Sequence, residues 1–376
     1  MENFINFRKH LHANPELSGF EKKTSEYVID ELKKLGLTTI HQGFSMYSFV
    51  AEINGKELGS TLLFRCELDA LPIQEISNLP HCSIHEGISH KCGHDGHIAI
   101  MLKFAQKLIG NPILGGKILL FFQSAEETGA GAKGAIESGF FNQFSIDYAF
   151  ALHNMPGFPM SAILAKENQF TPCVESCVFE LFGKTSHASE PQKGINPALA
   201  IAEMIHYFDS LIDTDKSSES YFLCTPIHVD MGEKAYGTSA GKAVVGYTFR
   251  TWENNKFDNM KVKIEQNVFQ IAQKYKLSLI TNWVETFNAN NNHPEAYQHI
   301  KKAASSLNLN IIELEKPFEI GEDFGLFTKK YKGAMFGLGS GINQPPLHNA
   351  DFDFPDELID VGSLMFSQIS RQLIES

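Results

Sequence analysis

Hydrophobic residues follow two spacings along the chain, and each spacing predicts a different kind of element. Short, almost unbroken apolar runs lie at Thr61–Cys66, Lys117–Gln123 and Asp147–Leu152. Such runs are typical of strands that are buried on both faces. Residues 21–37 and 97–110 instead place apolar side chains at helical intervals. The alternation of strands and helices predicts an α/β fold with a mainly parallel sheet covered by helices.

A different order of elements begins near residue 169. The spacing there predicts strand, helix, strand, strand, helix and strand, which is the β-α-β-β-α-β order of a ferredoxin-like unit. These elements are expected at residues 174–182, 196–213, 221–229, 243–251, 256–276 and 278–286. We therefore predict an inserted α+β domain over residues 169–286, with residues 1–168 and 287–376 forming the α/β domain.

Composition and charge limit the classes of partner. A chain of 376 residues favours two domains, and a net charge of -12 leaves no broad basic surface for nucleic acid or anionic lipid. The sequence contains no run of about 18 apolar residues, so no transmembrane helix is expected. The six cysteines form no C-x-x-C pair and no secretory signal pattern is present, which together favour a reduced, cytoplasmic protein.

Polar clusters follow the three buried apolar runs. They read RCELDALPIQE, SAEETGAGAKG and LHNMPGFP. In an open α/β sheet these clusters gather at the carboxyl ends of the strands, where ligands bind. The stretch HKCGHDGH, residues 90–97, is expected at the same edge. Its three histidines, one cysteine and one aspartate make this edge the candidate functional site.

Three interpretations of HKCGHDGH compete. A structural zinc site needs four ligands, usually in two pairs, and no second pair is present in the sequence. A cysteine nucleophile at Cys92 could use His94 as base and Asp95 as orienting group. That interpretation leaves four candidate site residues elsewhere in the chain without a role. They are Glu126, Glu127, His153 and His348.

Two metal ions give all of these residues a role. A pair of divalent cations needs a bridging anion, nitrogen and carboxylate ligands, and an open position for water. The thiolate of Cys92 can bridge, and Glu126 would be free to act as the general base. The remaining ligands would be His94, Glu127, His153 and His348. A mixture of sulfur, nitrogen and oxygen ligands suits Zn and also admits Mn, Co or Ni.

Eight segments carry a family resemblance that extends over nearly the whole chain. They are RKHLHANPELSGFE, FRCELDALPIQE, HKCGHDGHIAIML, FFQSAEETGAGAKGAIESG, ALHNMPGFP, GKTSHASEPQKGINPA, GEDFGLF and PPLHNADFDFPDEL. With these segments the chain resembles the di-metal aminoacylase and carboxypeptidase family. The resemblance is to the branch that contains hippurate hydrolase, N-acyl-amino-acid amidohydrolases and auxin-conjugate hydrolases.

The resemblance implies the same division of roles. It implies that Glu126 is the general base and that two metals bind to Cys92, His94, Glu127, His153 and His348. It also implies that residues 169–286 form a lid that dimerises, whose His187 stabilises the oxyanion, often across the dimer. Closure of a lid would require a hinge, expected near residues 168 and 287.

Several neighbouring residues have less defined roles. Asp69 is expected to accept a hydrogen bond from a ligating histidine. Glu67 stands where this branch usually has an aspartate and other branches have a metal-binding histidine, so its role stays open. His97 is expected to be scaffold, and Arg250 either pairs with a carboxylate of the lid or binds the substrate carboxylate. The remaining acidic pair, Glu322 and Asp323, either caps a helix or orients the site, and capping is the favoured expectation.

The expected activity is metal-dependent hydrolysis of the amide bond of N-acyl-L-amino acids. Water deprotonated by Glu126 would attack the acyl carbonyl, and Glu126 would return the proton to the leaving amine. A dipeptidase or carboxypeptidase using the same site is the nearest alternative. A protein that binds metal or amino acids without catalysis is a second alternative. The substrate is a small molecule, and the expected assembly is a homodimer formed through the lid.

Overall fold

A computed structural model describes residues 2–375, which form two compact units. The first unit contains the residues up to 170 together with residues 290–318 and those from 322 onward. The second contains residues 171–289 and the short segment 319–321. The inserted unit thus begins two residues later and ends three residues later than the sequence predicted. The return of residues 319–321 to it was not predicted.

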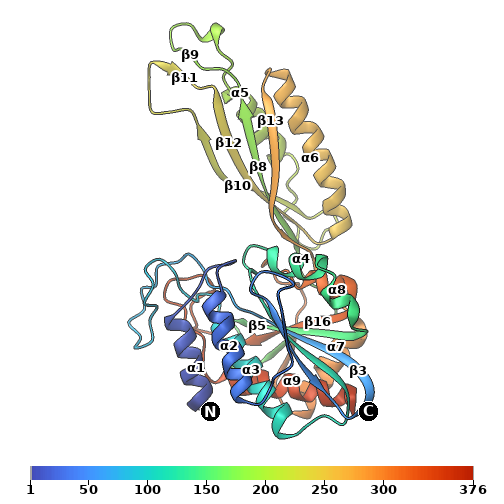
Figure 1. Cartoon of the computed structure of the whole chain (residues 1–376). Coiled ribbons are helices and arrows are strands. Elements are labelled where there is room, and N and C mark those ends of the chain that lie inside the picture. Colours follow the sequence, from blue (N-terminus) through green and yellow to red (C-terminus); the bar gives the residue numbers. More distant parts are fainter. Residues whose placement is uncertain (1, 376) are drawn as a thin grey trace. The chain divides into compact units, whose positions relative to one another are not determined.

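The first unit is built on a mixed, mainly parallel sheet of eight strands (Figure 1). Its order is β1-β2-β4-β3-β5-β16-β6-β15, and the four central strands β4, β3, β5 and β16 are parallel to their neighbours in this group. The strands are β1 (Ile40–Gln42), β2 (Phe49–Asn54), β3 (Glu57–Glu67), β4 (Gly115–Gln123), β5 (Ile146–Met155), β6 (Ile163–Ala165), β15 (Ile311–Glu313) and β16 (Lys332–Gly339). The predicted α/β class is confirmed.

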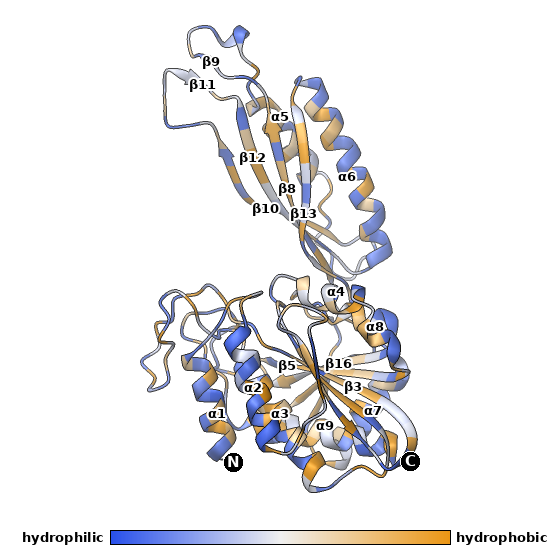
Figure 2. Cartoon of the chain, in the orientation of Figure 1, coloured by the Kyte–Doolittle hydropathy of each residue, from blue (hydrophilic) through white to orange (hydrophobic). Residues whose placement is uncertain are grey.

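Helices cover both faces of this sheet. One hydrophobic cluster joins one face to α1 (Glu2–Ala13), α2 (Lys22–Lys34), α3 (His94–Gly110), α7 (Pro294–Ser306) and α9 (Leu358–Ile374). A second cluster joins the other face to α4 (Ala130–Glu137), α8 (Gly325–Lys330) and the short 3₁₀ helix η1 (Phe140–Gln143). Figure 2 shows hydrophobic colour along β3, β5 and β16, between these helical layers.

Alternation along the central strands explains their apolar composition. On β3, Leu62 and Phe64 pack into the first cluster, whereas Leu63 packs into the second. On β4, Leu120 and Phe121 divide between the clusters in the same way. Because successive side chains of a strand point to opposite faces, a strand with two buried faces is apolar at every position. Because β4, β3, β5 and β16 run parallel, their carboxyl ends lie along one edge of the sheet.

The second unit has the predicted ferredoxin-like topology. Its four-stranded sheet has the order β10-β12-β8-β13, and every pairing in it is antiparallel. The elements are β8 (Cys173–Phe182), α5 (Ala198–Asp209), β10 (Phe222–Met231), β12 (Lys242–Thr251), α6 (Asn254–Lys274) and β13 (Ser278–Phe287). Helix α5 is shorter than predicted, and Asn196 accepts a hydrogen bond from the backbone N–H of Ala198 at 2.9 Å.

Small elements complete the two units. In the second unit β9 (Ser186–His187) pairs with β11 (Thr238–Ser239), and η2 (Pro191–Lys193) follows β9. Strands β7 (Asn168–Thr171) and β14 (Asn290–Asn292) pair with each other where the chain leaves and re-enters the first unit. Among residues 2–375, no helix is both long and apolar enough to cross a lipid bilayer.

Candidate metal centre

The candidate site lies at the carboxyl edge of the parallel strands in the first unit. Strand β3 leads into Asp69, β4 leads into Glu126 and Glu127, and β5 carries His153 near its end. The segment HKCGHDGH leads into α3, whose first residue is His94. The structure thus brings together side chains that four separate segments of the chain supply.

Two unusual backbone conformations set the direction of these segments. Ala125 has a φ of 54° and donates its N–H to Glu21 Oε1 at 2.7 Å. A positive φ is costly for a residue with a Cβ, so the buried Glu21 carboxylate holds this turn just before the glutamate pair. Gly93 has a φ of 94°, and a Cβ at this position would lie 2.5 Å from Asn154 Oδ1. Glycine at position 93 tolerates the positive φ and, because it has no Cβ, leaves room for the side chain of Asn154.

The candidate ligand atoms lie close to one another. Sγ of Cys92 is 3.4 Å from Nε2 of His153. His94 Nε2 lies 3.9 Å from both Glu126 Oε2 and Glu127 Oε1. Among the described residues, several groups have potential ligand atoms within 4.8 Å of one another, and three of them consist of predicted ligands and the predicted base. These three groups are Cys92, His94 and His153; Cys92, Glu127 and His348; and His94, Glu126 and Glu127. A further group is Glu67, His94 and His97.

Hydrogen bonds set the tautomers of two histidines. His94 Nδ1 donates to the backbone oxygen of Asp69 at 2.9 Å, and His153 Nδ1 donates to the backbone oxygen of Asn154 at 2.8 Å. Each ring therefore presents an unprotonated Nε2 to the site when it is neutral. His94 Nε2 and Glu127 Oε1 are buried and have no hydrogen-bond partner. Such atoms are costly when unpaired, and a divalent cation would satisfy both.

Burial and like charges dominate the electrostatics of the acidic residues. Burial raises the pKa of Glu126 well above its usual range, and Glu322 and Glu127 add to the effect. Burial also raises the pKa of Glu127 to about 7, although the charge of His94 opposes this. The pKa of the Cys92 thiol is raised by burial and by both glutamates. A thiol in these surroundings is not an activated nucleophile, because nucleophilic cysteines have lowered pKa values.

The last candidate ligand comes from the C-terminal part of the chain. His348 has a φ of 66°, and its backbone N–H donates to the oxygen of Lys91 at 2.8 Å. Its Nε2 lies 3.6 Å from Glu127 Oε2, and about half of its side chain is exposed. The contact with Lys91 joins this loop directly to the HKCGHDGH segment.

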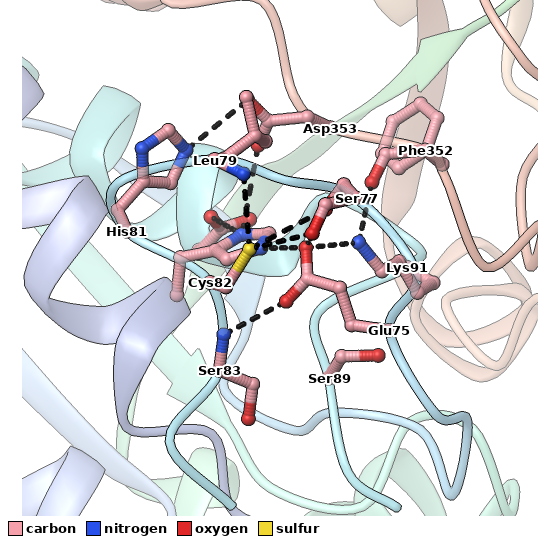
Figure 3. Close-up of polar contacts among 12 residues, drawn as sticks. Glu75, Ser77, Leu79, His81, Cys82, Ser83, Ser89, Lys91, Phe352 and Asp353 are labelled. Carbon is pink, nitrogen blue, oxygen red and sulfur yellow. Dashed lines mark hydrogen bonds and ion pairs between the residues drawn. The ribbon is translucent and has the colours of Figure 1, made fainter.

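A buried polar network supports the same junction (Figure 3). The ammonium group of Lys91 donates to Glu75 Oε1 at 2.6 Å and to the backbone oxygen of Phe352 at 2.8 Å. Glu75 also accepts the N–H of Ser83 at 2.8 Å and contacts His12 at 3.2 Å. The network joins the loop before Cys92, the N-terminal helix and the segment after His348.

Four acidic residues next to the candidate ligands have protein partners. Asp69 accepts the N–H of Glu127 at 2.9 Å through Oδ2, and its Oδ1 lies 3.3 Å from His94 Nδ1. Glu67 pairs with Arg65 and with His97. The expectation that Glu322 and Asp323 cap a helix was incomplete. Glu322 accepts the N–H of Phe324, and Asp323 accepts the N–H of Ala132 in α4, but both carboxylates also pair with the buried Arg65.

Two candidate residues belong to the second unit. His187 is exposed and accepts the N–H of Ser189 at its Nδ1 at 3.2 Å, so the proton of the neutral ring lies on Nε2. Arg250 donates through Nη1 to the backbone oxygen of Glu319 at 2.8 Å. His187 thus presents an N–H donor, and Arg250 has a backbone partner within its own unit.

Several residues that shape the site were not found from the sequence. Glu21, Arg65 and Asn154 are buried and contact the segments that carry the candidate ligands. Arg65 and Glu67 are two apart on β3 and so share one face of the strand, which is a signal that alternation offers. The contact of Glu21 with Ala125 joins residues 104 positions apart and has no local signal.

The first unit has a mainly parallel sheet with a buried cluster of sulfur, nitrogen and carboxylate ligands at its carboxyl edge. Together with the ferredoxin-like insertion, this cluster defines a two-domain metallohydrolase. The family model described as peptidase family M20/M25/M40 matches residues 63–372, and the chain belongs to this family.

Known relatives match over almost their whole length. Hippurate hydrolase of Campylobacter jejuni is 28% identical, with 99% of this chain and 97% of the relative aligned. Thermostable carboxypeptidase 2 of Saccharolobus solfataricus is 30% identical, with 96% and 92% aligned. A solved Bacillus subtilis structure, described as a dinuclear metal binding peptidase from this family, has a TM-score of 0.82 at 26% identity and covers 100% of this chain and 98% of its own.

Proposed function

We propose that this protein is a di-metal amidohydrolase that cleaves the amide bond of N-acyl-L-amino acids into a carboxylate and a free amino acid. The observation that carries the proposal is the ligand cluster around Cys92, in which buried His94 Nε2 and Glu127 Oε1 lack a hydrogen-bond partner. The hippurate hydrolase relative supports the choice of substrate class. The dinuclear solved structure supports two metals per chain.

The proposed ligands are Cys92, His94, Glu127, His153 and His348, with Asp69 orienting His94. Two bound divalent ions would lower the pKa of water towards neutrality and polarise the acyl carbonyl. Glu126 is buried beside this cluster, with its Oε2 3.9 Å from His94 Nε2, and would accept the proton of the attacking water. It then returns that proton to the leaving nitrogen as the C–N bond breaks.

The proposed oxyanion donor is His187. Its Nδ1 accepts a hydrogen bond from Ser189, so its Nε2–H is available to donate to the oxygen that becomes negative during attack. Arg250 is proposed to bind the free carboxylate of the substrate, since a guanidinium group forms charge-assisted hydrogen bonds to carboxylates. Both residues belong to the second unit, which is proposed to act as the lid with hinges near residues 168 and 287.

The substitution Glu126→Gln tests the assigned base. Gln keeps the size of the side chain but cannot take up the proton, so kcat should fall by roughly 10²- to 10⁴-fold while both metals stay bound. Glu86→Gln is the matched control, because Glu86 is exposed and lies outside the cluster. Metal content and N-acyl-amino-acid hydrolysis are measured together. An active Glu126→Gln enzyme would refute the role, and metal binding without turnover by the unchanged protein would favour a non-catalytic protein.

The second candidate function is a carboxypeptidase or dipeptidase. The 30% identical thermostable carboxypeptidase favours it, and a peptide bond presents the same amide to the proposed site. Hydrolysis of N-acetyl-amino acids and of dipeptides with the same C-terminal residue is compared at equal metal loading. A higher kcat/KM for the dipeptides would replace the first proposal.

The proposed metals are Zn, Mn, Co or Ni, because thiolate, imidazole and carboxylate ligands together admit each of them. The metal-free protein is loaded with each ion separately, and activity is measured on a panel of N-acyl amino acids. The ion that gives the highest activity at two equivalents per chain identifies the functional metal.

A homodimer through the second unit is proposed from an exposed edge strand. Among the described residues β12 is the one strand that pairs with β10, and the other edge of β10 carries an isolated bridge from Phe222 to Asp213 but no strand. Ile227, Val229 and Met231 are 60%, 47% and 41% exposed, and they alternate along this strand. An exposed apolar edge strand is a surface on which a second chain can pair.

Sedimentation measures the assembly. The dimer should have about twice the 42.0 kDa mass of the chain, and Val229→Lys should reduce its stability. Val262→Lys is the control, because Val262 is 53% exposed but lies on α6. A monomeric unchanged protein would refute the proposal.

We also propose a cytoplasmic location, supported by six unpaired cysteines, which cell fractionation tests.

A further inference from the structure

We propose that Glu67 is a positioning residue that acts through His97 on the ligand His153, and that Glu67 does not itself bind metal. The inference rests on the proposed di-metal function and assigns a role to a residue that the sequence left open. It depends on a continuous series of buried contacts in the first unit, which joins Arg65, Glu67, His97 and Asn154 to His153.

Both oxygens of Glu67 already have protein donors. Oε1 pairs with Arg65 Nη1, and Oε2 accepts a hydrogen bond from His97 Nδ1 at 2.8 Å. The side chains of Glu67 and Arg65 are completely buried. Glu127 differs, because its Oε1 is buried and has no hydrogen-bond partner. Of these two carboxylates, Glu127 has an oxygen without a hydrogen-bond partner and Glu67 does not.

The two nitrogens of His97 are also occupied. Nε2 accepts the backbone N–H of Asn154 at 3.2 Å, so the ring proton must lie on Nδ1, where it is donated to Glu67. A neutral histidine has only one acceptor nitrogen, and here the protein backbone uses it. His97 is therefore not available as a ligand, even though it lies near His94 and Glu67.

Asn154 passes the effect to the metal ligand. Its N–H is held by His97, and its backbone oxygen accepts Nδ1–H of His153 at 2.8 Å. The rings of His97 and His153 are also in edge contact, with centroids 4.8 Å apart and planes at 80°. His97 thus contacts His153 directly and also holds the backbone group that orients it.

Arg65 anchors the other end of this series. Its Nη2 lies 2.5 Å from Asp323 Oδ1 and 2.9 Å from Glu322 Oε1. Its Nε donates to Gln123 Oε1 at 3.1 Å. Because two further carboxylates face the guanidinium group, loss of the Glu67 charge would not leave Arg65 unpaired. A neutral residue at position 67 therefore removes the link to His97 without leaving an isolated buried cation.

The substitution Glu67→Gln changes the direction of hydrogen bonding at nearly constant size. If the amide NH₂ faces His97, two donors meet, and His97 must move its proton to Nε2, where it opposes the N–H of Asn154. If the amide oxygen faces His97, the NH₂ group opposes the Arg65 guanidinium instead. Either arrangement disturbs the group that orients His153, and loss of such supporting contacts typically weakens metal binding by about 10- to 100-fold.

The test compares Glu67→Gln, His97→Gln and the double variant with Glu52→Gln as matched control. Glu52 also bridges a cation and a histidine, through Lys117 at 2.6 Å and His41 at 2.8 Å, but it lies on β2 away from the cluster. Cobalt and zinc are titrated into each metal-free protein against a competing chelator. Visible absorption of the cobalt forms reports the ligand field and the thiolate contact.

The expected result is two cobalt ions per chain in every variant, with affinity at one site reduced by about 10- to 100-fold in both single variants. The cobalt ligand-field bands should shift while the thiolate band from Cys92 remains. The double variant should be no weaker than the weaker single variant, because both substitutions break one series of contacts. Glu52→Gln should match the unchanged protein.

Three results would overturn the inference. Loss of one equivalent of metal in Glu67→Gln would make Glu67 a ligand. Unchanged metal affinity and spectra in this variant would give Glu67 no role. Additive losses of metal affinity in the double variant would show that Glu67 acts independently of His97. His97→Gln keeps the pair of Glu67 with Arg65 and therefore still gives an answer if Glu67→Gln does not fold. Failure of the unchanged protein to bind metal would overturn the proposed function itself.

Discussion

The substitution Gly93→Ala tests the backbone geometry that holds the candidate metal centre together. Gly93 has a φ of 94°, and the left-handed region costs a residue with a Cβ about 1–2 kcal/mol. The new Cβ would lie 2.5 Å from Asn154 Oδ1, and overpacking of this kind typically costs about 1–3 kcal/mol. The free energy of unfolding should therefore fall by about 2–5 kcal/mol, a large part of the usual stability of a domain.

Gly87→Ala separates the two contributions. Gly87 also has a positive φ, 75°, and lies shortly before the candidate ligands, but a Cβ there has nothing within 4 Å. This control should lose only the conformational part, about 1–2 kcal/mol. The difference between the two variants then measures the close approach to Asn154.

Urea unfolding followed by far-ultraviolet circular dichroism is the assay. Dichroism is needed because both tryptophans, Trp252 and Trp283, belong to the second unit and their fluorescence does not report on the first. Metal affinity is measured in parallel, since Gly93 lies between Cys92 and His94. Only Gly93→Ala should weaken metal binding. Equal losses of stability in the two variants, or unchanged metal affinity in Gly93→Ala, would refute the reasoning.

Two further predictions concern the cysteine and the N-terminal network. Cys92→Ser should lower metal affinity, measured by chelator competition, and enzyme treated with a chelator should be inactive. If the metal-free enzyme instead keeps full activity and a thiol reagent abolishes that activity, Cys92 is a nucleophile. Burial opposes the charge of His12, but Asp95 and Glu75 raise its pKa from 6.5 to about 9. The raised pKa contributes on the order of 3 kcal/mol to the free energy of unfolding. This contribution is fully present below pH 6.5 and is lost as the pH rises through 9. Urea unfolding should show this loss, and a His12→Gln variant that shows it equally would contradict the assignment.

The sequence predicted the fold well because its strongest signals are local. Within Lys117–Gln123, the residues Ile118–Phe122 are apolar at every position, as expected for a strand with two buried faces. The ferredoxin-like order followed from the same kind of signal over residues 174–286. The return of residues 319–321 to the second unit was missed, since a three-residue segment has no periodicity from which its partner can be inferred.

The candidate ligands were also accessible from the sequence, because parallel strands deliver the residues that follow them to one edge. Their supporting contacts were less accessible. Asp323 accepts a hydrogen bond from Gln123, 200 residues away, and pairs with Arg65, 258 residues away. The sequence favoured a helix cap for this residue, since capping is a local interaction and these pairings are not. Alternation on β3 alone could have linked Arg65 with Glu67.

The electrostatics of the site favour a metal centre over a nucleophilic cysteine. Burial and neighbouring carboxylates raise the pKa of Glu127 to about 7 and raise those of Glu126 and the Cys92 thiol. In the metal-free protein at neutral pH, the two glutamates therefore retain protons that exposed carboxyl groups lose, and the thiol stays protonated. A nucleophilic cysteine requires the opposite, a lowered thiol pKa. Because cations must displace these protons, metal affinity should rise with pH as protons are released, so the burial that inactivates the free thiol also makes the site depend on metal.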